Sequence, residues 1–160
     1  MISLEVDVKS LQWVPGKLAT GAIYFSIDGK EFPEKGWNDF LVIILNWWLS
    51  AILRIVNNGS TSESFTFMDG PFELHIEVTK DEKSLFLKGI HNMGECSTIL
   101  ISSKVKQIDF FKTIINTSEK VVCFCKSKNW DFKDLTELEL AVSSLKKALE
   151  KDPSPKLVLE

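Results

Sequence analysis

The residues best suited to chemistry are two carboxylates and a histidine that alternate along one short segment, Glu73, His75 and Glu77. On a β-strand, alternate side chains share one face, so these three would lie together. They could do general acid/base work if a cavity dehydrated them and shifted their pKa values. A solvated sheet face, partly neutralised by Lys88 opposite His75, explains the same residues without any chemistry.

Binding is the preferred functional interpretation of this segment, ahead of catalysis. Four further acidic residues lie close to it in the sequence: Glu63, Asp69, Asp81 and Glu82. An acidic strand face would attract a basic partner and speed its encounter. The predicted partner-binding residues are Glu73, His75, Glu77, Asp69 and Lys88.

The histidines and cysteines add no complete catalytic or metal signature. His75 and His91 are the two histidines, and neither lies in an HExxH spacing. His91 and Cys96 could act as a base and a thiol nucleophile only if the fold brought them together. Cys123 and Cys125 would point about 200° apart on a helix, whereas on a strand they would share a face. Because glycine-rich phosphate loops and GxSxG elbows are also missing, we predict no catalytic residue, metal or cofactor.

The run from Trp37 to Gly59 is the most apolar in the chain, which is typical of a membrane span, a core helix or a binding surface. A bilayer span needs about 20 consecutive apolar residues. Arg54 alone would cost about 3 kcal/mol near the bilayer centre, and Asn46 and Ser50 interrupt the run further. We therefore predict a long, mostly buried helix over residues 38–57 and no membrane span.

The polar side of this helix is the alternative site. On a helix of 3.6 residues per turn, one narrow stripe contains Asp39, Asn46, Ser50, Arg54 and Asn57. Where the stripe meets a sheet it could line a pocket for a small ligand or a substrate, with Trp47 beside it as an aromatic anchor. The predicted pocket residues are Asp39, Asn46, Ser50, Arg54 and Trp47. Asn38 or Asp39 would also cap the start of the helix, and Asn57 to Gly59 would end it.

Segments on both sides of the helix predict antiparallel strands. Residues 19–28 are rich in Ile, Tyr and Phe and end in the turn signal Asp28-Gly29. Residues 62–90 alternate apolar and polar side chains around Asp69-Gly70, a strong hairpin signal. The expected cross-strand pairs are Phe67 with Phe72, Phe65 with Leu74, Ile76 with Leu87 and Val78 with Leu85. A strand over 97–102 and an edge strand over 2–8 complete the sheet.

After the sheet, the apolar residues recur every three or four positions, which predicts two helices. The first helix should bury Val105, Ile108, Phe111, Ile115, Ser118, Val122 and Cys125. The second helix should be capped by Asp131 or Asp134, and its buried seam should be Leu135, Leu138, Val142, Leu145 and Leu149. Lysines interleaved with phenylalanines over 104–133 would also suit RNA, but Asp109 and Glu119 dilute the charge, and a solvated helix face is preferred. The predicted fold is α+β: an antiparallel, meander-rich sheet, one long helix across it and two C-terminal helices.

Size and composition bound the domain organisation. A chain of 160 residues suits one domain that buries a core without disulfides, so we predict a domain over 1–152 and a short tail over 153–160. The formal net charge of -3 argues against a general nucleic-acid binder. Three cysteines suit reduced thiols, and the N-terminus does not read as a secretory signal, which together predict a cytoplasmic protein.

Two stretches within residues 20–80, FPEKGWNDFLVIILNWWL and FMDGPF, resemble a pattern in small bacterial proteins linked to polymorphic toxin systems as immunity proteins. The FP, GWND, WW and MDGP elements carry the resemblance, and no active-site residues come with it. It implies a cytosolic protein that binds and blocks a cognate toxin domain. The negative net charge of the chain suits a basic partner. The alternative is a small-ligand-binding domain or an enzyme with its pocket at the polar stripe.

Overall fold

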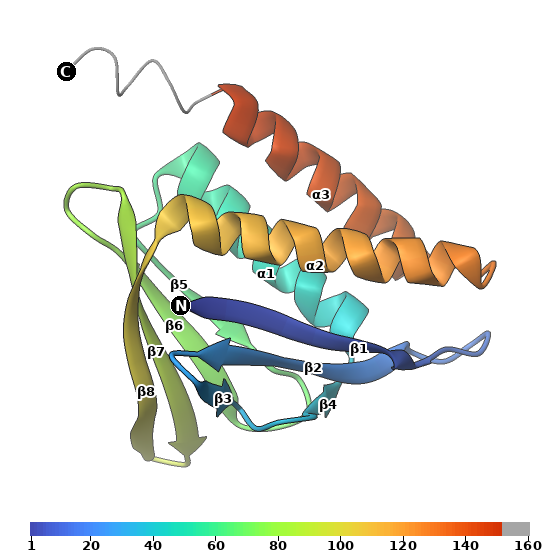
Figure 1. Ribbon diagram of the computed structural model, residues 1–160, viewed down its shortest axis with the longest axis horizontal. Helices are drawn as coiled ribbons and strands as arrows, with labels where there is room; N and C mark the ends of the chain where they lie inside the picture. Colours follow the sequence, from blue (N-terminus) through green and yellow to red (C-terminus); the bar gives the residue numbers. More distant parts are fainter. Residues whose placement is uncertain (152–160) are drawn as a thin grey trace.

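The computed structural model describes residues 1–151, which form an α+β fold of two antiparallel sheets and three helices (Figure 1). In chain order the elements are β1 (Ile2–Gln12), β2 (Thr20–Ile27), β3 (Lys30–Phe32), β4 (Asn38–Asp39), α1 (Leu41–Asn58), β5 (Ser62–Thr66), β6 (Phe72–Val78), β7 (Ser84–Met93), β8 (Cys96–Lys106), α2 (Gln107–Ser127) and α3 (Lys133–Lys151). The predicted α+β class with one long helix and two C-terminal helices is confirmed. The strands, however, divide into two sheets where one was expected. The predicted tail over 153–160 lies outside the described residues.

The first sheet, sheet A, has the strand order β1-β2-β3, and β4 pairs with the other end of β2. The edge strand expected over 2–8 is present and extends to Gln12. The turn between β2 and β3 is Asp28-Gly29, as expected, and both residues have positive φ, 50° and 85°. That is the backbone of a type I′ turn, which matches the twist of a hairpin.

The second sheet, sheet B, has the order β5-β6-β7-β8. The expected pairs Phe65 with Leu74, Ile76 with Leu87 and Val78 with Leu85 all occur. Phe67 donates its backbone N–H to the carbonyl of Phe72 over 3.1 Å, which closes the hairpin as predicted. β8 is longer than the predicted strand over 97–102. Sheet B stands at one end of the molecule, and its strands run across the direction of β1 and β2 (Figure 1).

The long helix α1 begins later than predicted. Asn38 and Asp39 form β4 rather than the first turn, and the N-cap residue, Phe40, makes no side-chain capping bond. The predicted cap is therefore wrong, because the chain uses these two residues to pair with β2. The predicted end is confirmed: Gly59 has the left-handed φ of 69°, a conformation that glycine adopts without steric penalty. The length and composition of α1 would also permit a membrane crossing, although half of the helix is buried inside the fold.

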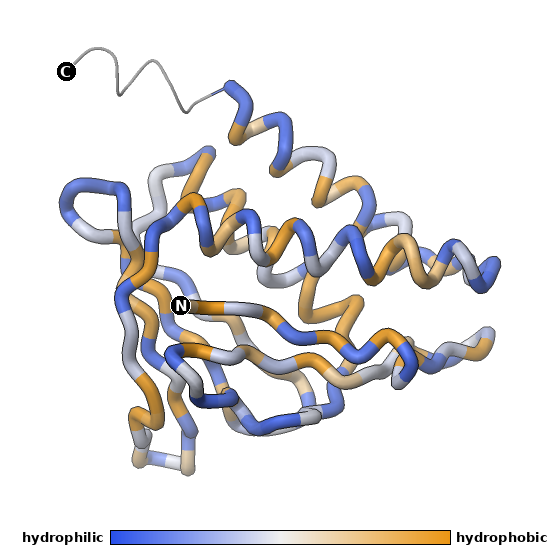
Figure 2. Tube along the Cα trace, viewed as in Figure 1, coloured by the Kyte–Doolittle hydropathy of each residue, from blue (hydrophilic) through white to orange (hydrophobic). Residues whose placement is uncertain are grey.

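The core lies where α1, sheet A and sheet B meet, and its centre is aromatic. The Trp48 ring stacks on Phe65 at 5.1 Å between centroids and also contacts Phe25 and Phe67. Phe110 of α2 closes the cluster against Phe25 and Phe65. Figure 2 shows the hydrophobic residues of α1 gathered between the other elements.

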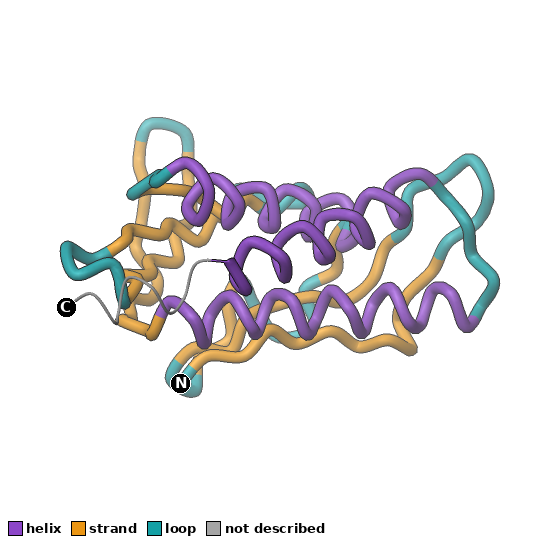
Figure 3. The backbone as a smooth tube through the Cα atoms, turned by 90° about the horizontal axis from the view of Figure 1, so that it is seen from above, coloured by secondary structure: helices purple, strands orange, loops and turns teal. Residues whose placement is uncertain are grey.

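α2 and α3 complete the helical layer, which lies on one side of the strands (Figure 3). α2 packs on β1 and on α3, and α3 packs on α1. The seam of α3 is confirmed, with Leu135, Leu138, Val142 and Leu145 buried. The buried face expected for α2 was partly wrong, because the helix starts at Gln107 and turns Phe110, Phe111 and Ile114 inward. Val105 belongs to β8, and Ile108 is exposed.

Candidate functional site

Sheet B has an inner and an outer face, and the outer face is the candidate site. Along β6, Leu74 and Ile76 are fully buried, whereas His75 between them is partly exposed. The helices lie on the inner side, so the other side of the sheet is open (Figures 1 and 3). An antiparallel sheet of this kind can face water on one side. Residues on this side of neighbouring strands lie opposite one another in the register. They form the outer face: Ser62, Ser64, Thr66, Glu73, His75, Glu77, Phe86, Lys88, Ser102 and Lys104.

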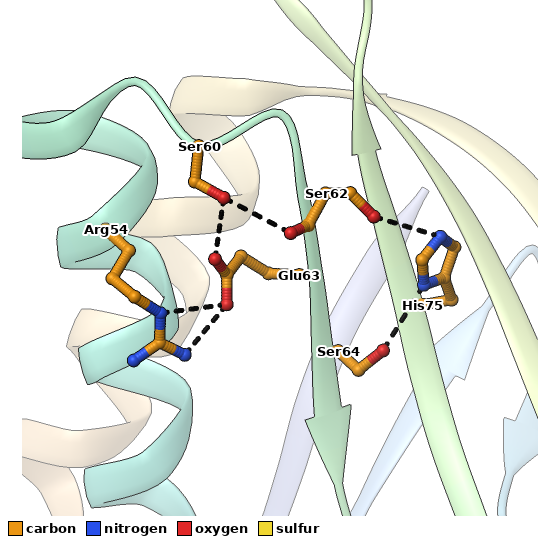
Figure 4. Close-up of polar contacts among 6 residues, drawn as sticks. All are labelled: Arg54, Ser60, Ser62, Glu63, Ser64 and His75. Carbon is orange, nitrogen blue, oxygen red and sulfur yellow. Dashed lines mark hydrogen bonds and ion pairs between the residues drawn. The ribbon is translucent and has the colours of Figure 1, made fainter.

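His75 is the centre of a small polar network on this face. Its Nδ1 lies 3.2 Å from the hydroxyl of Ser64, and its Nε2 lies 3.4 Å from the hydroxyl of Ser62. The same Nε2 is 3.2 Å from a carboxylate oxygen of Glu77. Figure 4 shows both serines reaching His75 from the neighbouring strand. Since only 26% of the His75 side chain is accessible, these contacts hold the ring in one orientation.

The register therefore brings together most of the predicted partner-binding residues. His75 lies opposite Lys88 on β7, as expected. Glu73 and Glu77 flank His75 on the same strand, and half of the Glu77 side chain is accessible. A histidine with a carboxylate on one side and hydroxyls on the other can bind a partner's polar groups.

Phe86 and Lys104 join this face, and sequence reasoning did not identify either of them as site residues. Phe86 lies opposite Glu77, and 46% of it is exposed. The ammonium group of Lys104 lies 5.6 Å from the centre of the Phe86 ring, a cation–π contact. The alternation of residues 84–88 was the available signal, because Phe86 falls on the same side of its strand as Lys88. The outer face is thus acidic on β6 and basic on β7 and β8.

Asp69 does not share this face. It lies in the turn between β5 and β6, and its backbone N–H donates to the Asp39 carboxylate over 3.2 Å. Asp39 is 1% exposed and also accepts hydrogen bonds from the Trp37 indole nitrogen, at 2.9 Å, and from the backbone of Phe40, at 2.7 Å. Three donors therefore satisfy one buried carboxylate, as burial of a charge requires.

Trp37 and the hairpin turn pack closely around this carboxylate. A Cβ atom added to Gly70 would come within 2.6 Å of the Trp37 ring. Phe72 packs edge-on against the same ring at 5.3 Å between centroids. The GWND and MDGP elements of the sequence are therefore in contact, and they join sheet A, the start of α1 and sheet B. Their role in this structure is to position elements.

The residues of the polar stripe are not brought together in one pocket. Asp39 lies outside α1, as described above. The amide of Asn46 donates to the carbonyl of Asp134 on α3, and Arg54 binds Glu63 on β5 over 2.8 Å. Two hollows in residues 1–151 have other linings, one between the β2–β3 turn and β8 and one beside Trp13 and Phe40. Ser50 and Trp47 are exposed on the remaining side of the helix.

The Arg54–Glu63 pair lies on the inner side of β5, across the strand from His75 and its serines (Figure 4). The hydrogen bond from Arg54 lowers the pKa of Glu63, partial burial opposes this shift, and a bond from Ser60 adds to it. This pair joins the end of α1 to the first strand of sheet B. It acts as a structural contact at the margin of the candidate site.

The thiols and the second histidine do not form a site. Cys123 is exposed and Cys125 is buried, so the two point apart, as the helical interpretation predicted. Burial raises the pKa of the Cys125 thiol to about 11, which keeps it protonated at neutral pH. His91 stacks on Phe72 at 4.5 Å between ring centres. Within residues 1–151, no three His, Cys, Asp or Glu side chains converge as metal ligands would.

No protein-family model matches this chain, and no curated protein or solved structure is similar enough to count as a match. The comparisons therefore do not place the chain in a family, and the resemblance to immunity proteins stays a prediction from the FP, GWND, WW and MDGP elements.

Proposed function

We propose that the chain is a non-enzymatic binding protein of the immunity type, which binds a cognate bacterial toxin domain in the cytoplasm and blocks it. The observation that carries the proposal is the open outer face of sheet B, where an ordered histidine network and an exposed aromatic ring lie side by side. Aromatic side chains flanked by charges are typical of interface centres. The sequence resemblance supplies the class of partner.

The charges of the outer face define what the partner must present. Glu73 and Glu77 on β6 suit basic side chains, and the exposed carboxylate of Glu77 is the more accessible of the two. Lys88 on β7 and Lys104 on β8 suit acidic side chains or carbonyl oxygens at the rim of the partner's binding surface. The expected toxin domain therefore places its basic patch against β6, with Phe86 buried at the boundary.

The alternative, a pocket at the polar stripe of α1, has less support. Asn46 and Arg54 are engaged by α3 and β5, so a ligand would have to displace contacts that join elements of the fold. The Asp39 carboxylate is likewise occupied by three donors from its own chain. Binding at the outer face requires no such rearrangement.

Neutralisation in cells tests the function directly. The product of each gene adjacent to the one that encodes this chain is expressed alone and together with the chain. We expect one product to stop growth when alone and to be harmless when co-expressed. If no neighbouring product is toxic, or if toxicity persists at equal expression, the immunity function is wrong.

The position of the interface is tested with the purified pair. Glu73→Lys combined with Glu77→Lys should slow association about tenfold at low salt and less at high salt, because the lost attraction is long-range and screened. Glu137→Lys combined with Glu150→Lys on α3 is the matched control, since both glutamates are exposed and the change in net charge is the same. Equal slowing in both double variants would mean that only total charge matters and that the partner does not bind this face.

A further inference from the structure

β8 is the unprotected edge of sheet B. Of the strands in residues 1–151, β7 alone pairs with it. The opposite edge strand, β5, lies against α1, where the Trp48 indole nitrogen donates to the Thr66 carbonyl and Arg54 binds Glu63. β8 is instead exposed along most of its length. An edge strand with free backbone groups is a template for another strand.

The exposed part of β8 lacks the residues that normally prevent such pairing. Residues 96–103, CSTILISS, contain neither a charge nor a proline. Ile99 is 55% exposed and Leu100 is 45% exposed, and Figure 2 shows this hydrophobic stretch at the outside of the sheet. Natural edges usually carry lysines or prolines at such positions. The first charge along this strand is Lys104.

We propose that β8 pairs in an antiparallel manner with β8 of a second copy of the chain, so that two four-stranded sheets become one continuous sheet across a twofold axis. A twofold axis perpendicular to the sheet keeps both outer faces on the same side. The proposal does not depend on the toxin partner, because it rests on the unpaired edge of β8. Ser102 and Lys104, which belong to the outer face, also lie on this strand.

A bulge in β8 restricts the register of this pairing. Ile101 lies opposite Gly89 and Ile99 lies opposite Ile90, so Leu100 is the extra residue. Ile99 consequently points to the same side as Ser102, three positions away. Opposed residues in a sheet share a face. A register that centres the twofold axis on the bulge meets this condition, with Ile99 of one copy facing Ser102 of the second copy and Leu100 and Ile101 beside the axis.

The same register is complementary in charge. If Ile99 faces Ser102, then Ser97 faces Lys104 of the other copy, and Glu95, in the turn directly before β8, comes close to Lys106 of the other copy. Glu95 and Lys106 are both exposed in one chain, and symmetry forms the contact twice in a dimer. Opposite charges that face each other across two strands stabilise the pair, whereas a register that set Lys104 against Lys104 would not.

The neighbouring turn leaves room for an incoming strand. A hollow of about 300 Å³ separates β8 from the β2–β3 turn and is lined on that side by Ile27, Asp28 and Lys30. Asp28 holds the turn in place by accepting a bond from the Ser103 hydroxyl over 2.8 Å. Side chains on the inner side of a second β8 would enter this hollow.

Sedimentation equilibrium of the unaltered chain is the first test. We expect a monomer–dimer equilibrium that shifts to dimer as concentration rises. Amide hydrogen exchange over residues 97–103 should slow in step with dimer formation, while exchange in the β6–β7 turn stays constant. A monomer at every concentration, or a dimer with unchanged exchange in β8, would overturn the proposal.

Two matched variants then locate the contact. Ile99→Lys should abolish the dimer, whereas Leu140→Lys, at an α3 leucine that is 63% exposed, should leave it intact. Equal effects of the two would assign the association to general hydrophobicity and contradict the β8 pairing. Circular dichroism of each variant establishes that it is folded.

Charge reversal tests the register. Glu95→Lys and Lys106→Glu should each weaken the dimer about tenfold at low salt, because each creates two like-charge contacts. The double variant carrying both changes should restore the dissociation constant of the unaltered chain. If the double variant dimerises no more tightly than either single variant, the proposed register is wrong.

Discussion

The inner and outer faces of sheet B are built from the same strands and differ in almost every other respect. On the inner face, Phe65, Leu74 and Ile76 are inaccessible to solvent, and Phe65 stacks on Trp48. On the outer face, the alternate residues Ser64, His75 and Glu77 contact one another through polar atoms. The alternation of a pleated strand separates the two sets completely. One face can therefore determine folding while the other remains free to bind.

The largest effect is expected from the inner face. Trp48→Ala removes a fully buried ring that contacts three phenylalanines and donates to the Thr66 carbonyl. We expect a loss of about 3–5 kcal/mol in the free energy of unfolding, since the site can collapse only partly. Urea denaturation followed by circular dichroism measures it.

The adjacent tryptophan is the matched control. Trp47 lies next to Trp48 on α1 but is 43% exposed, so Trp47→Ala should cost less than about 1 kcal/mol. If the two variants lose similar stability, the assignment of inner and outer sides to α1 is wrong.

The next effect comes from the contact that joins the two sheets. Asp39→Ala leaves the buried donors of Trp37, Phe40 and Asp69 without their acceptor. We expect a loss of about 3 kcal/mol, because hydrogen bonds to a charged group contribute about 1.5–3 kcal/mol each and water can replace some of them. Thermal and chemical denaturation measure the loss.

Asp131→Ala, at an exposed aspartate before α3, serves as the comparison for Asp39. It should change stability by less than about 0.5 kcal/mol. A similarly small effect of Asp39→Ala would show that the carboxylate is dispensable and that packing around Trp37 alone holds the turn.

A smaller, pH-dependent effect is expected at the Arg54–Glu63 pair. Since Arg54 lowers the pKa of Glu63 below its ordinary value of 4.5, the folded state binds a proton less readily than the unfolded chain. The contribution is therefore complete above pH 4.5 and is lost as pH falls through the lower folded pKa. Because Arg54 is half-exposed, the pair contributes only about 1 kcal/mol.

The difference in stability between the unaltered chain and Glu63→Gln isolates this pair from other carboxylates. It should be largest at neutral pH and shrink toward zero in acid. Glu137→Gln provides the control, since its partner Lys133 is exposed and lies 3.8 Å away. A Glu63→Gln difference that grows in acid would contradict the direction of the shift.

The sequence predicted those parts of the fold that depend on local periodicity. The Asp69-Gly70 turn and the alternating residues around it set the register of three strands, down to His75 opposite Lys88. The division into two sheets was not predictable, because alternation along a strand does not tell which other strands it pairs with, and within residues 1–151 β1–β4 pair only among themselves. The strand β4 (Asn38–Asp39) was expected as the start of α1. A two-residue strand has no periodicity to detect.

The candidate site shows the same limit. Glu73, His75 and Glu77 share a face because a strand alternates, which the sequence alone implies. Asp69 was expected with them because it is acidic and close in sequence, but its backbone is bound by Asp39, thirty positions away. Lys104 reaches Phe86 from another strand. Such contacts between distant segments require the tertiary fold.

The smallest effect is expected on the outer face itself. Glu73→Lys combined with Glu77→Lys should change the free energy of unfolding by less than about 0.5 kcal/mol, because Glu77 is half-exposed and its contact with His75 lies at the surface. The inner side of β6, which carries Leu74 and Ile76, is untouched by both changes. Chemical denaturation measures the change. Moderate salt in the buffer screens the repulsion between the new lysines and Lys104.

A measured loss above about 2 kcal/mol would mean that the outer face also contributes to folding. The comparison with the inner face would then fail, and slow binding by the double variant could no longer be assigned to the interface. If stability is unchanged, the same variant separates the folding role of β6 from its binding role. Leu74 and Ile76 hold β6 in the core, while the residues between and beside them are available for contact with a partner.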